Sequence, residues 1–428
     1  MRVLFFFIVI FIAIAGCADL QTSPDRPYKA QVLHFEPQST GNSSGWSVQE
    51  RTLSTLEDLN SLKGRYFQIL PGGTLQITST VGSLITGTGS ASSSSDALRY
   101  NIKNGVIVPR DTTTLLALSS FHAFEQTFSS LKETTGLEPE AFSEQVGGRY
   151  RIFFEPVISL SDSGETAQIS LKLNAAFNPE SDNFFLFKRS EIEQIPLAAN
   201  FKVIAHEFGH AIFKRAFFKQ KNEVCLNTND ETKVSRQTDK FFPGRFAVEY
   251  AISGLNEGFA DFMSAMMTGE ADVLTGSFPG DGPTSRSLTS TRFTFADLSR
   301  DSLCSGKFYC IGTLFARALY KTAQLYGDDK SSLYAFSRRV YRAIDQTSEN
   351  LAQSPARDIL PIPSTEAIFC KRSESVRLAY DGLLTSAFLA AFLQGFSAGN
   401  EKSQLCAQLV SAFGSFGFTL EARGGCQF

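Results

Sequence analysis

The segment from residue 201 to residue 215 constrains this chain more than any other. It reads Phe-Lys-Val-Ile-Ala-His-Glu-Phe-Gly-His-Ala-Ile-Phe-Lys-Arg. On an α-helix His206 and His210 lie one turn apart on the same face, so two imidazoles can bind one metal ion, and Glu207 can reach the open side of that ion. A second, apolar face predicts that the helix is buried against a core. It consists of Ile204, Phe208, Ala211 and Ile212.

A catalytic zinc ion takes three protein ligands and keeps a further position for water. We expect the third ligand in a second helical segment, which contains Asn256, Glu257 and Asp261. Glu257 and Asp261 are spaced i and i+4 and share a helix face, so Glu257 is expected to ligate the metal. Asp261 is expected to accept the other ring N–H of a ligating histidine, His206 in the first place, and to fix its tautomer.

The combination of His-Glu-x-x-His with Asn-Glu-x-x-x-Asp resembles the gluzincin metallopeptidases, in particular those of the thermolysin type. Residues 173–177 (Leu-Asn-Ala-Ala-Phe) are similar to the edge strand with which that family binds the substrate backbone, a role that would fall to Asn174 and Ala175. The resemblance extends over residues 113–323. It implies an α+β zincin fold with an N-terminal β-rich lobe carrying the edge strand, a central metal-binding helix and a mainly α-helical C-terminal lobe.

The same resemblance implies one catalytic Zn²⁺ and a peptide or protein substrate. Glu207 would be the general base that takes a proton from a metal-activated water. Calcium is also compatible with the family. The sequence has no Asp-x-Asp-x-Asp-Gly loop, however, so no calcium ligands are assigned.

The chain departs from the family in two respects. Between His210 and Glu257 lie 46 residues (257 − 210 − 1), more than the family usually has, so an insertion is predicted at residues 220–245. No histidine follows the motif, so the family's transition-state-stabilising histidine has no match, and a tyrosine would have to replace it. The candidates are Tyr250, Tyr309 and Tyr320; Tyr309 is preferred because it precedes a predicted helix where the family's residue falls in chain order.

Residues 1–16 are predicted to be a signal peptide. Arg2 precedes an apolar run of twelve residues, Leu4 to Ala15, which is too short to span a bilayer. The end of the run resembles a bacterial lipoprotein signal, cleaved before Cys17, which would then carry acyl chains; the alternative is an ordinary secretory signal. The residue after the cysteine is Ala18 and not the Asp that is linked to inner-membrane retention. The expected location is therefore the bacterial cell envelope, lipid-anchored in the outer membrane and facing the periplasm or the exterior.

Charge limits the possible partners, and cysteine content agrees with an exported protein. The net charge of −3, without a basic run, argues against a nucleic-acid partner. Beyond Cys17, an even number of cysteines predicts up to three disulfides in an oxidising compartment, with Cys304 and Cys310 as the most obvious pair. The alternative interpretation is that the cysteines bind zinc, but no C-x-x-C spacing occurs. The cysteines are Cys225, Cys304, Cys310, Cys370, Cys406 and Cys426.

The chain divides into three predicted parts after the signal. Residues 17–50 are expected to be a tether and residues 51–112 a small β-rich or pro-like region, two alternatives that the sequence does not separate. Residues 113–428 are predicted to form the metallopeptidase domain: an N-terminal lobe (113–219), the insertion and a helical C-terminal lobe (246–428). Long helices are predicted at Thr114–Thr135, Ala198–Phe218, Phe246–Met267, Ile311–Tyr326, Ser331–Gln346, Val376–Phe396 and Lys402–Phe413.

These patterns predict a zinc-dependent endopeptidase. One alternative is a non-catalytic surface lipoprotein that contains zinc and binds a partner, although a structural zinc site has no need of Glu207 as a base. An anchored aminopeptidase is less favoured. The run Leu-Asn-Glu-Gly-Phe-Ala at residues 255–260 matches that group, but its Gly-x-Met-Glu-Asn exopeptidase motif is missing.

Overall fold

The computed structural model describes residues 27–36, 45–72, 74–81, 84–90, 98–160, 175–179, 181–187, 196–218, 248–273, 286–290, 294, 308–353, 383–394, 396 and 399–415. Several predicted features lie outside these residues. They are the signal peptide at 1–16, the lipidation site Cys17, Asn174 of the edge strand and the insertion at 220–245.

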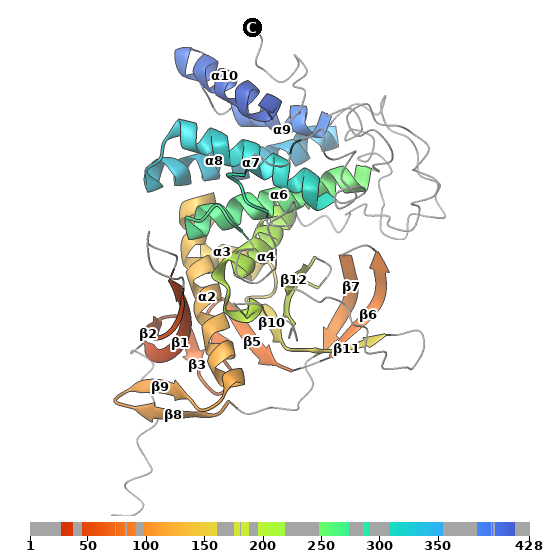
Figure 1. The fold of residues 1–428 in the computed structure, drawn as a ribbon. Helices are drawn as coiled ribbons and strands as arrows, with labels where there is room; N and C mark the ends of the chain where they lie inside the picture. Colours follow the sequence, from red (N-terminus) through yellow and green to blue (C-terminus); the bar gives the residue numbers. More distant parts are fainter. Residues whose placement is uncertain are drawn as a thin grey trace, which may run out of the picture.

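Helix α2 (Thr112–Thr135) is the element on which the N-terminal lobe is built (Figure 1). It begins where the carboxylate of Asp111 accepts the backbone N–H of Thr114 at 2.7 Å, an N-cap that satisfies one of the helix's first donors. It ends at Gly136, whose φ of 82° lies in the left-handed region that closes many helices. Its apolar side chains recur every three or four residues and are buried: Leu118, Phe121, Phe124, Phe128 and Leu131.

This helix packs on a six-stranded mixed sheet. In spatial order the strands are β12 (Ala175–Asn178), β13 (Asn183–Leu186), β10 (Tyr150–Phe154), β5 (Phe67–Pro71), β4 (Lys63–Gly64) and β3 (Leu56–Asp58). The contact between helix and sheet is aromatic: ring centroids lie 4.6 Å apart for Phe67 and Phe121, and 5.2 Å apart for Phe124 and Phe184. Phenylalanine side chains from the helix and the sheet thus fill this part of the core.

Two further sheets complete the β-rich lobe. One is four-stranded, in the order β2 (Gly45–Leu53), β1 (Tyr28–Glu36), β9 (Val106–Pro109) and β8 (Tyr100–Lys103). The other is three-stranded, in the order β11 (Val157–Leu160), β6 (Thr74–Val81) and β7 (Leu84–Ser90).

For the described residues 28–36 and 45–50, the hairpin β1–β2 corrects the prediction that residues 17–50 form a tether. Ala30 and Val32 are fully buried, and the backbone N–H of Leu33 donates to Ser119 of α2 at 2.9 Å. These residues therefore belong to the folded lobe, because their alternate side chains enter its core.

The boundary predicted at residue 113 also needs correction, because it would place β5 and β10 in different units. The two strands pair in parallel in one sheet. Glu125 of α2 also accepts hydrogen bonds from Ser54 and Thr55, in the turn between β2 and β3. The strands of residues 51–112 are therefore part of the N-terminal lobe and not a separate small domain.

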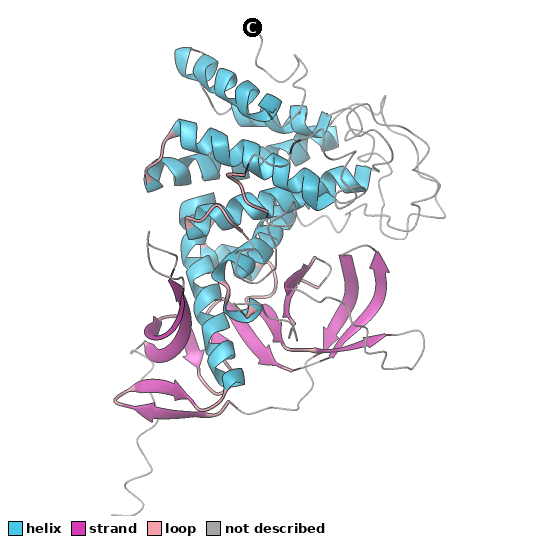
Figure 2. Ribbon diagram, viewed as in Figure 1, coloured by secondary structure: helices cyan, strands magenta, loops and turns pink. Residues whose placement is uncertain are grey.

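The C-terminal lobe is helical, and Figure 2 shows the strands and these helices gathered in opposite halves of the molecule. Its helices are α6 (Val248–Thr268), α7 (Phe308–Tyr326), α8 (Lys330–Gln353), α9 (Leu383–Gln394) and α10 (Asn400–Ser415). The predicted α+β class, with a β-rich N-terminal part and a helical C-terminal part, is confirmed. No helix among the described residues is both long and apolar enough to cross a membrane.

Of the six cysteines predicted to form disulfides, the described residues include Cys310 in α7 and Cys406 in α10. Both are buried and disulfide-bonded. Cys304, the expected partner of Cys310, lies outside the described residues, so the pairing stays a prediction.

Replacing the N-cap residue Asp111 with alanine is expected to lower the free energy of unfolding by about 1 kcal/mol, because the N–H of Thr114 loses its acceptor. The hydrogen bonds from Thr114 lower the pKa of Asp111 in the folded state. This contribution to stability is therefore present above the unfolded pKa and is lost as pH falls through the folded pKa.

Chemical denaturation at neutral and acidic pH checks the expectation. Asp111→Asn keeps a side-chain acceptor and should retain most of the stability at neutral pH, without the acid-dependent part. Equal stability of Asp111→Ala and the unaltered protein at neutral pH would contradict the capping role.

Candidate metal centre

Helix α4 (Phe201–Phe213) carries both histidines of the motif. It follows the short η1 helix (Leu197–Ala199) and begins at Asn200, whose side-chain oxygen accepts the N–H of Lys202 at 3.1 Å. Its apolar face is buried as the sequence predicts; Phe208 packs against Phe128 of α2, with ring centroids 4.8 Å apart. The α-helix continues into a π-helical turn, η2 (Lys214–Phe218). Both histidines are thus fixed on a helix that packs against α2.

Helices α4, α6 and α7 approach so closely that glycine is required at their contacts. A Cβ atom added at Gly209 would lie 2.7 Å from Cα of Ala260 in α6. One added at Gly258 would lie 2.5 Å from the carbonyl oxygen of Gly312 in α7. Because real Cβ atoms do not approach backbone this closely, these glycines allow the helix backbones to touch. The contact brings the glutamate of α6 over the histidines of α4.

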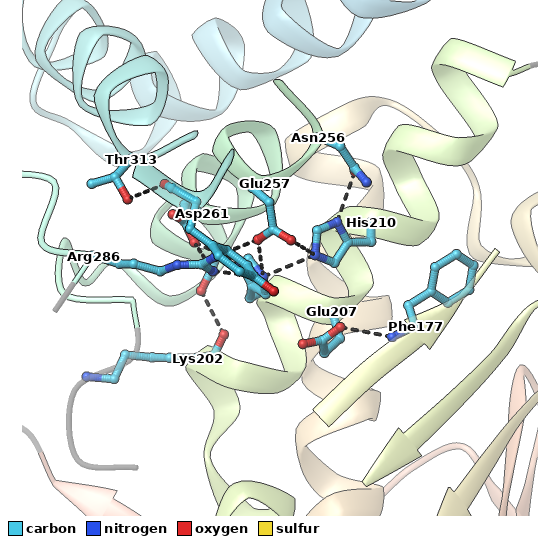
Figure 3. Close-up of polar contacts among 12 residues, drawn as sticks. Phe177, Lys202, Glu207, His210, Asn256, Glu257, Asp261, Arg286 and Thr313 are labelled. Carbon is cyan, nitrogen blue, oxygen red and sulfur yellow. Dashed lines mark hydrogen bonds and ion pairs between the residues drawn. The ribbon is translucent and has the colours of Figure 1, made fainter. Parts of the chain in front are cut away.

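Three side chains converge on one point, namely His206, His210 and Glu257. Figure 3 shows the carboxylate of Glu257 facing the ring of His210. The Nε2 atoms of the two histidines are 3.1 Å apart, Oε2 of Glu257 is 3.3 Å from Nε2 of His206, and Oε1 is 3.7 Å from Nε2 of His210. Ligands bound tetrahedrally at about 2.0–2.1 Å are separated by about 3.4 Å, so this donor set fits a zinc-sized ion. It is the metal-ligand cluster found among the described residues.

Each histidine has a polar partner at its other ring nitrogen. Nδ1 of His206 lies 2.9 Å from Oδ1 of Asp261, which is fully buried, and Nδ1 of His210 lies 2.9 Å from Oδ1 of Asn256. An acceptor at Nδ1 holds the proton there and directs the Nε2 lone pair towards the centre. The structure therefore brings Asp261 to His206, as its spacing from Glu257 suggested. Asn256, for which the sequence analysis named no contact, has the same position beside His210.

Glu207 lies on α4 between the two histidines and is held by the sheet. The backbone N–H of Phe177, in β12, donates to Oε2 of Glu207 at 2.9 Å, and Figure 3 shows the carboxylate pointing towards this strand. Strand β12 is last in the order of the six-stranded sheet. Ala175, predicted to bind substrate, is in this strand opposite Leu186 of β13.

Arg286, which the sequence analysis missed, reaches the centre from the segment between α6 and α7. One guanidinium nitrogen, Nη2, is 2.6 Å from Oε2 of Glu257. The other, Nη1, is 3.2 Å from Oδ1 of Asp261 and 3.2 Å from Nε2 of His206. Nothing in the local sequence distinguishes Arg286, which lies in a loop-like segment and is one of 40 Lys and Arg residues.

Tyr309, the preferred tyrosine of the three candidates, lies in the first turn of α7. The guanidinium carbon of Arg286 is 4.5 Å from the centre of its ring, a cation–π contact. Tyr320 is farther along α7, and its pKa is raised by burial. Tyr250 lies in α6. The structure therefore links Tyr309 to the metal centre through Arg286.

Buried charges shift the acid–base behaviour of the centre in the absence of metal. Burial raises the pKa of Glu257, but the positive charges of Arg286 and His210 outweigh it and hold that pKa well below its ordinary value. Burial lowers the pKa of His206, but hydrogen bonding to Asp261 and Glu257 outweighs this effect and raises it to about 9. A metal ion must displace the proton from His206, so metal affinity is expected to weaken as pH falls.

No protein-family model and no curated protein sequence matches this chain. Among solved structures, the chain is similar to the precursor of protealysin, a metalloproteinase from Serratia proteamaculans. The TM-score is 0.43 and the sequence identity 11%, over 86% of this chain and 92% of that chain. At this level of similarity, the chemistry of the centre has to be inferred from its own side chains.

Proposed function

We propose that this protein is a zinc-dependent endopeptidase of the gluzincin type, with His206, His210 and Glu257 as metal ligands. One observation carries the proposal: Glu207 lies on the same helix as the two histidines, and the N–H of Phe177 holds its carboxylate. A structural metal site has no use for a carboxylate that is oriented but does not ligate. This arrangement therefore favours catalysis over a purely structural metal.

The residues of the centre have distinct tasks in this proposal. When bound, a zinc ion supplies a water of lowered pKa and polarises the substrate carbonyl. Glu207 accepts the water's proton and donates it to the leaving amine nitrogen. The hydrogen bond from Phe177 keeps Oε2 of Glu207 in place, so the other carboxylate oxygen accepts and later donates the proton. Asp261 and Asn256 hold the two imidazoles in the orientation that ligation requires.

The substrate backbone is proposed to lie along β12, in contact with Asn174 and Ala175. An extended peptide added beside the last strand of a sheet would place its carbonyl groups near Glu207. Tyr309 remains our candidate for the hydroxyl that stabilises the oxyanion. Unchanged turnover in Tyr309→Phe would remove it from that role.

Export and anchoring complete the proposal. The signal at residues 1–16, lipidation at Cys17 and a location in the bacterial outer membrane rest on the sequence pattern. Labelling of the expressed protein with a radioactive fatty acid, with Cys17→Ser as control, tests the anchor.

The full-length protein should contain one zinc ion per chain and cleave an unstructured protein such as casein at internal bonds. Chelation should remove both zinc and cleavage, and added zinc should restore both. Bound zinc without cleavage of any substrate would favour the non-catalytic lipoprotein. Cleavage of peptides with free N-termini but not of blocked ones would instead favour an aminopeptidase.

A further inference from the structure

The guanidinium group of Arg286 contacts the same side-chain atoms that would bind a metal ion. Its Nη2 atom binds Oε2 of Glu257 at 2.6 Å, and Nη1 lies 3.2 Å from Nε2 of His206, the nitrogen whose lone pair a metal would take. The side chain is 7% exposed, so water cannot screen its charge effectively. The guanidinium thus lies within the donor set and not at its periphery.

The fold holds Arg286 in this position by several independent contacts. Its φ of 46° is in the left-handed region, which a residue with a side chain rarely adopts. The next residue, Ser287, offers its carbonyl to Nε of Arg317 at 2.7 Å, and the N–H of Leu288 donates to Ala271 at 2.9 Å. The ring of Tyr309 contacts the guanidinium. Such a conformation persists only where the surrounding structure imposes it.

This arginine compensates part of the charge of two buried carboxylates. Glu257 and Asp261 are both bound by Arg286, and Oδ2 of Asp261 has no hydrogen-bond partner in the described part of the chain. Without a nearby cation, these carboxylates would repel each other, and no attraction would offset the free-energy cost of removing them from water. A doubly charged metal ion would supply that compensation by itself.

We propose that Arg286 is a counter-ion of the metal-free centre and that it competes with the metal ion for Glu257. This inference rests on the proposed metal site but not on peptide hydrolysis. Arg286 would stabilise the metal-free fold more than the metal-bound fold, because its positive charge contacts the same carboxylate that would bind the metal ion. By linkage, a residue that stabilises only the metal-free state weakens metal binding. Arg286 therefore keeps the empty centre folded and limits its affinity for metal.

The test is the zinc affinity of the full-length protein, measured by competition with a chromophoric chelator, for the unaltered chain and for Arg286→Gln. We expect Arg286→Gln to bind zinc about tenfold more tightly, which corresponds to about 1.4 kcal/mol. Its thermal midpoint should fall more in the metal-free form than in the zinc-loaded form. If metal-free Arg286→Gln does not fold, Arg286→Lys is the second variant. Lysine keeps the charge but cannot contact Glu257 and Asp261 through two separate nitrogens, so zinc should bind more tightly than to the unaltered chain, by less than tenfold.

Arg339→Gln is the matched control. Arg339, in α8, is likewise stacked on aromatic rings, those of Phe396 and Tyr326, at 3.9 and 5.5 Å. Its replacement should lower the stability of both forms equally and leave zinc affinity unchanged. Unchanged or weaker zinc binding in both Arg286 variants would overturn the proposal. Zinc binding is measured without substrate, so this outcome is independent of whether the protein proves to be a peptidase.

Discussion

Replacing Glu207 with glutamine is expected to slow peptide hydrolysis by about 10²–10⁴-fold, the usual contribution of a general base, while zinc remains bound. Glutamine has nearly the shape of glutamate and its carbonyl can still accept the N–H of Phe177, but it cannot take a proton from water. The three ligands are unchanged, so the metal content should stay the same. The measurements are kcat/KM for a peptide with blocked ends and the zinc content per chain.

Glu270→Gln is the control for the loss of one negative charge beside α4. Glu270 pairs with Lys202, in the first turn of α4, at 2.8 Å, and its replacement should leave hydrolysis close to that of the unaltered protein. Full activity in Glu207→Gln would show that the base lies elsewhere. Zinc loss in that variant would mean that Glu207 acts on the metal and not on the water.

Adding a single methyl group at Gly258 is expected to damage both the fold and the metal centre. In Gly258→Ala the new Cβ would lie 2.5 Å from the carbonyl oxygen of Gly312, and backbone cannot yield as a flexible side chain can. Overpacking of this kind typically costs about 1–3 kcal/mol of unfolding free energy. Glu257 is the adjacent residue, so separating α6 from α7 should also displace a ligand and weaken zinc binding. Chemical denaturation and chelator competition measure the two effects.

Gly414→Ala tests whether these losses come from the close approach and not from glycine replacement in general. Gly414 lies in α10 with nothing within 4 Å of an added Cβ. Alanine in a helix is favoured over glycine by up to about 1 kcal/mol, so this variant should be as stable as the unaltered protein or slightly more so. Normal stability and zinc affinity in Gly258→Ala would show that the two helices can separate without cost.

The candidate ligands were predictable because their pairing on each helix depends on local periodicity. Two residues at i and i+4 share a helix face wherever the helix lies, so the spacings of His206 and His210, and of Glu257 and Asp261, predict their pairing within each helix. The structure brings the two pairs together.

The N-terminal hairpin was not predictable in the same way. Strand β1 pairs in parallel with β9, Lys29 with Val106, across a long stretch of chain. A short mixed segment contains no sign of so distant a partner, so residues 17–50 resembled a tether. Pairing between distant strands depends on tertiary contacts that local patterns do not encode.

The sequence by itself predicted the long helices and the pairs of candidate donors on each helix, because these follow from residue type and from repeats of three to four positions, and the family resemblance predicted the α+β class. Only the tertiary structure decided what surrounds the donors. Three contacts join segments far apart in the chain. Helix α6 packs closely against α4 and α7 at glycines, Phe177 of β12 donates a hydrogen bond to Glu207, and Arg286 binds Glu257. Such contacts depend on the packed geometry of the whole fold, which no local spacing specifies.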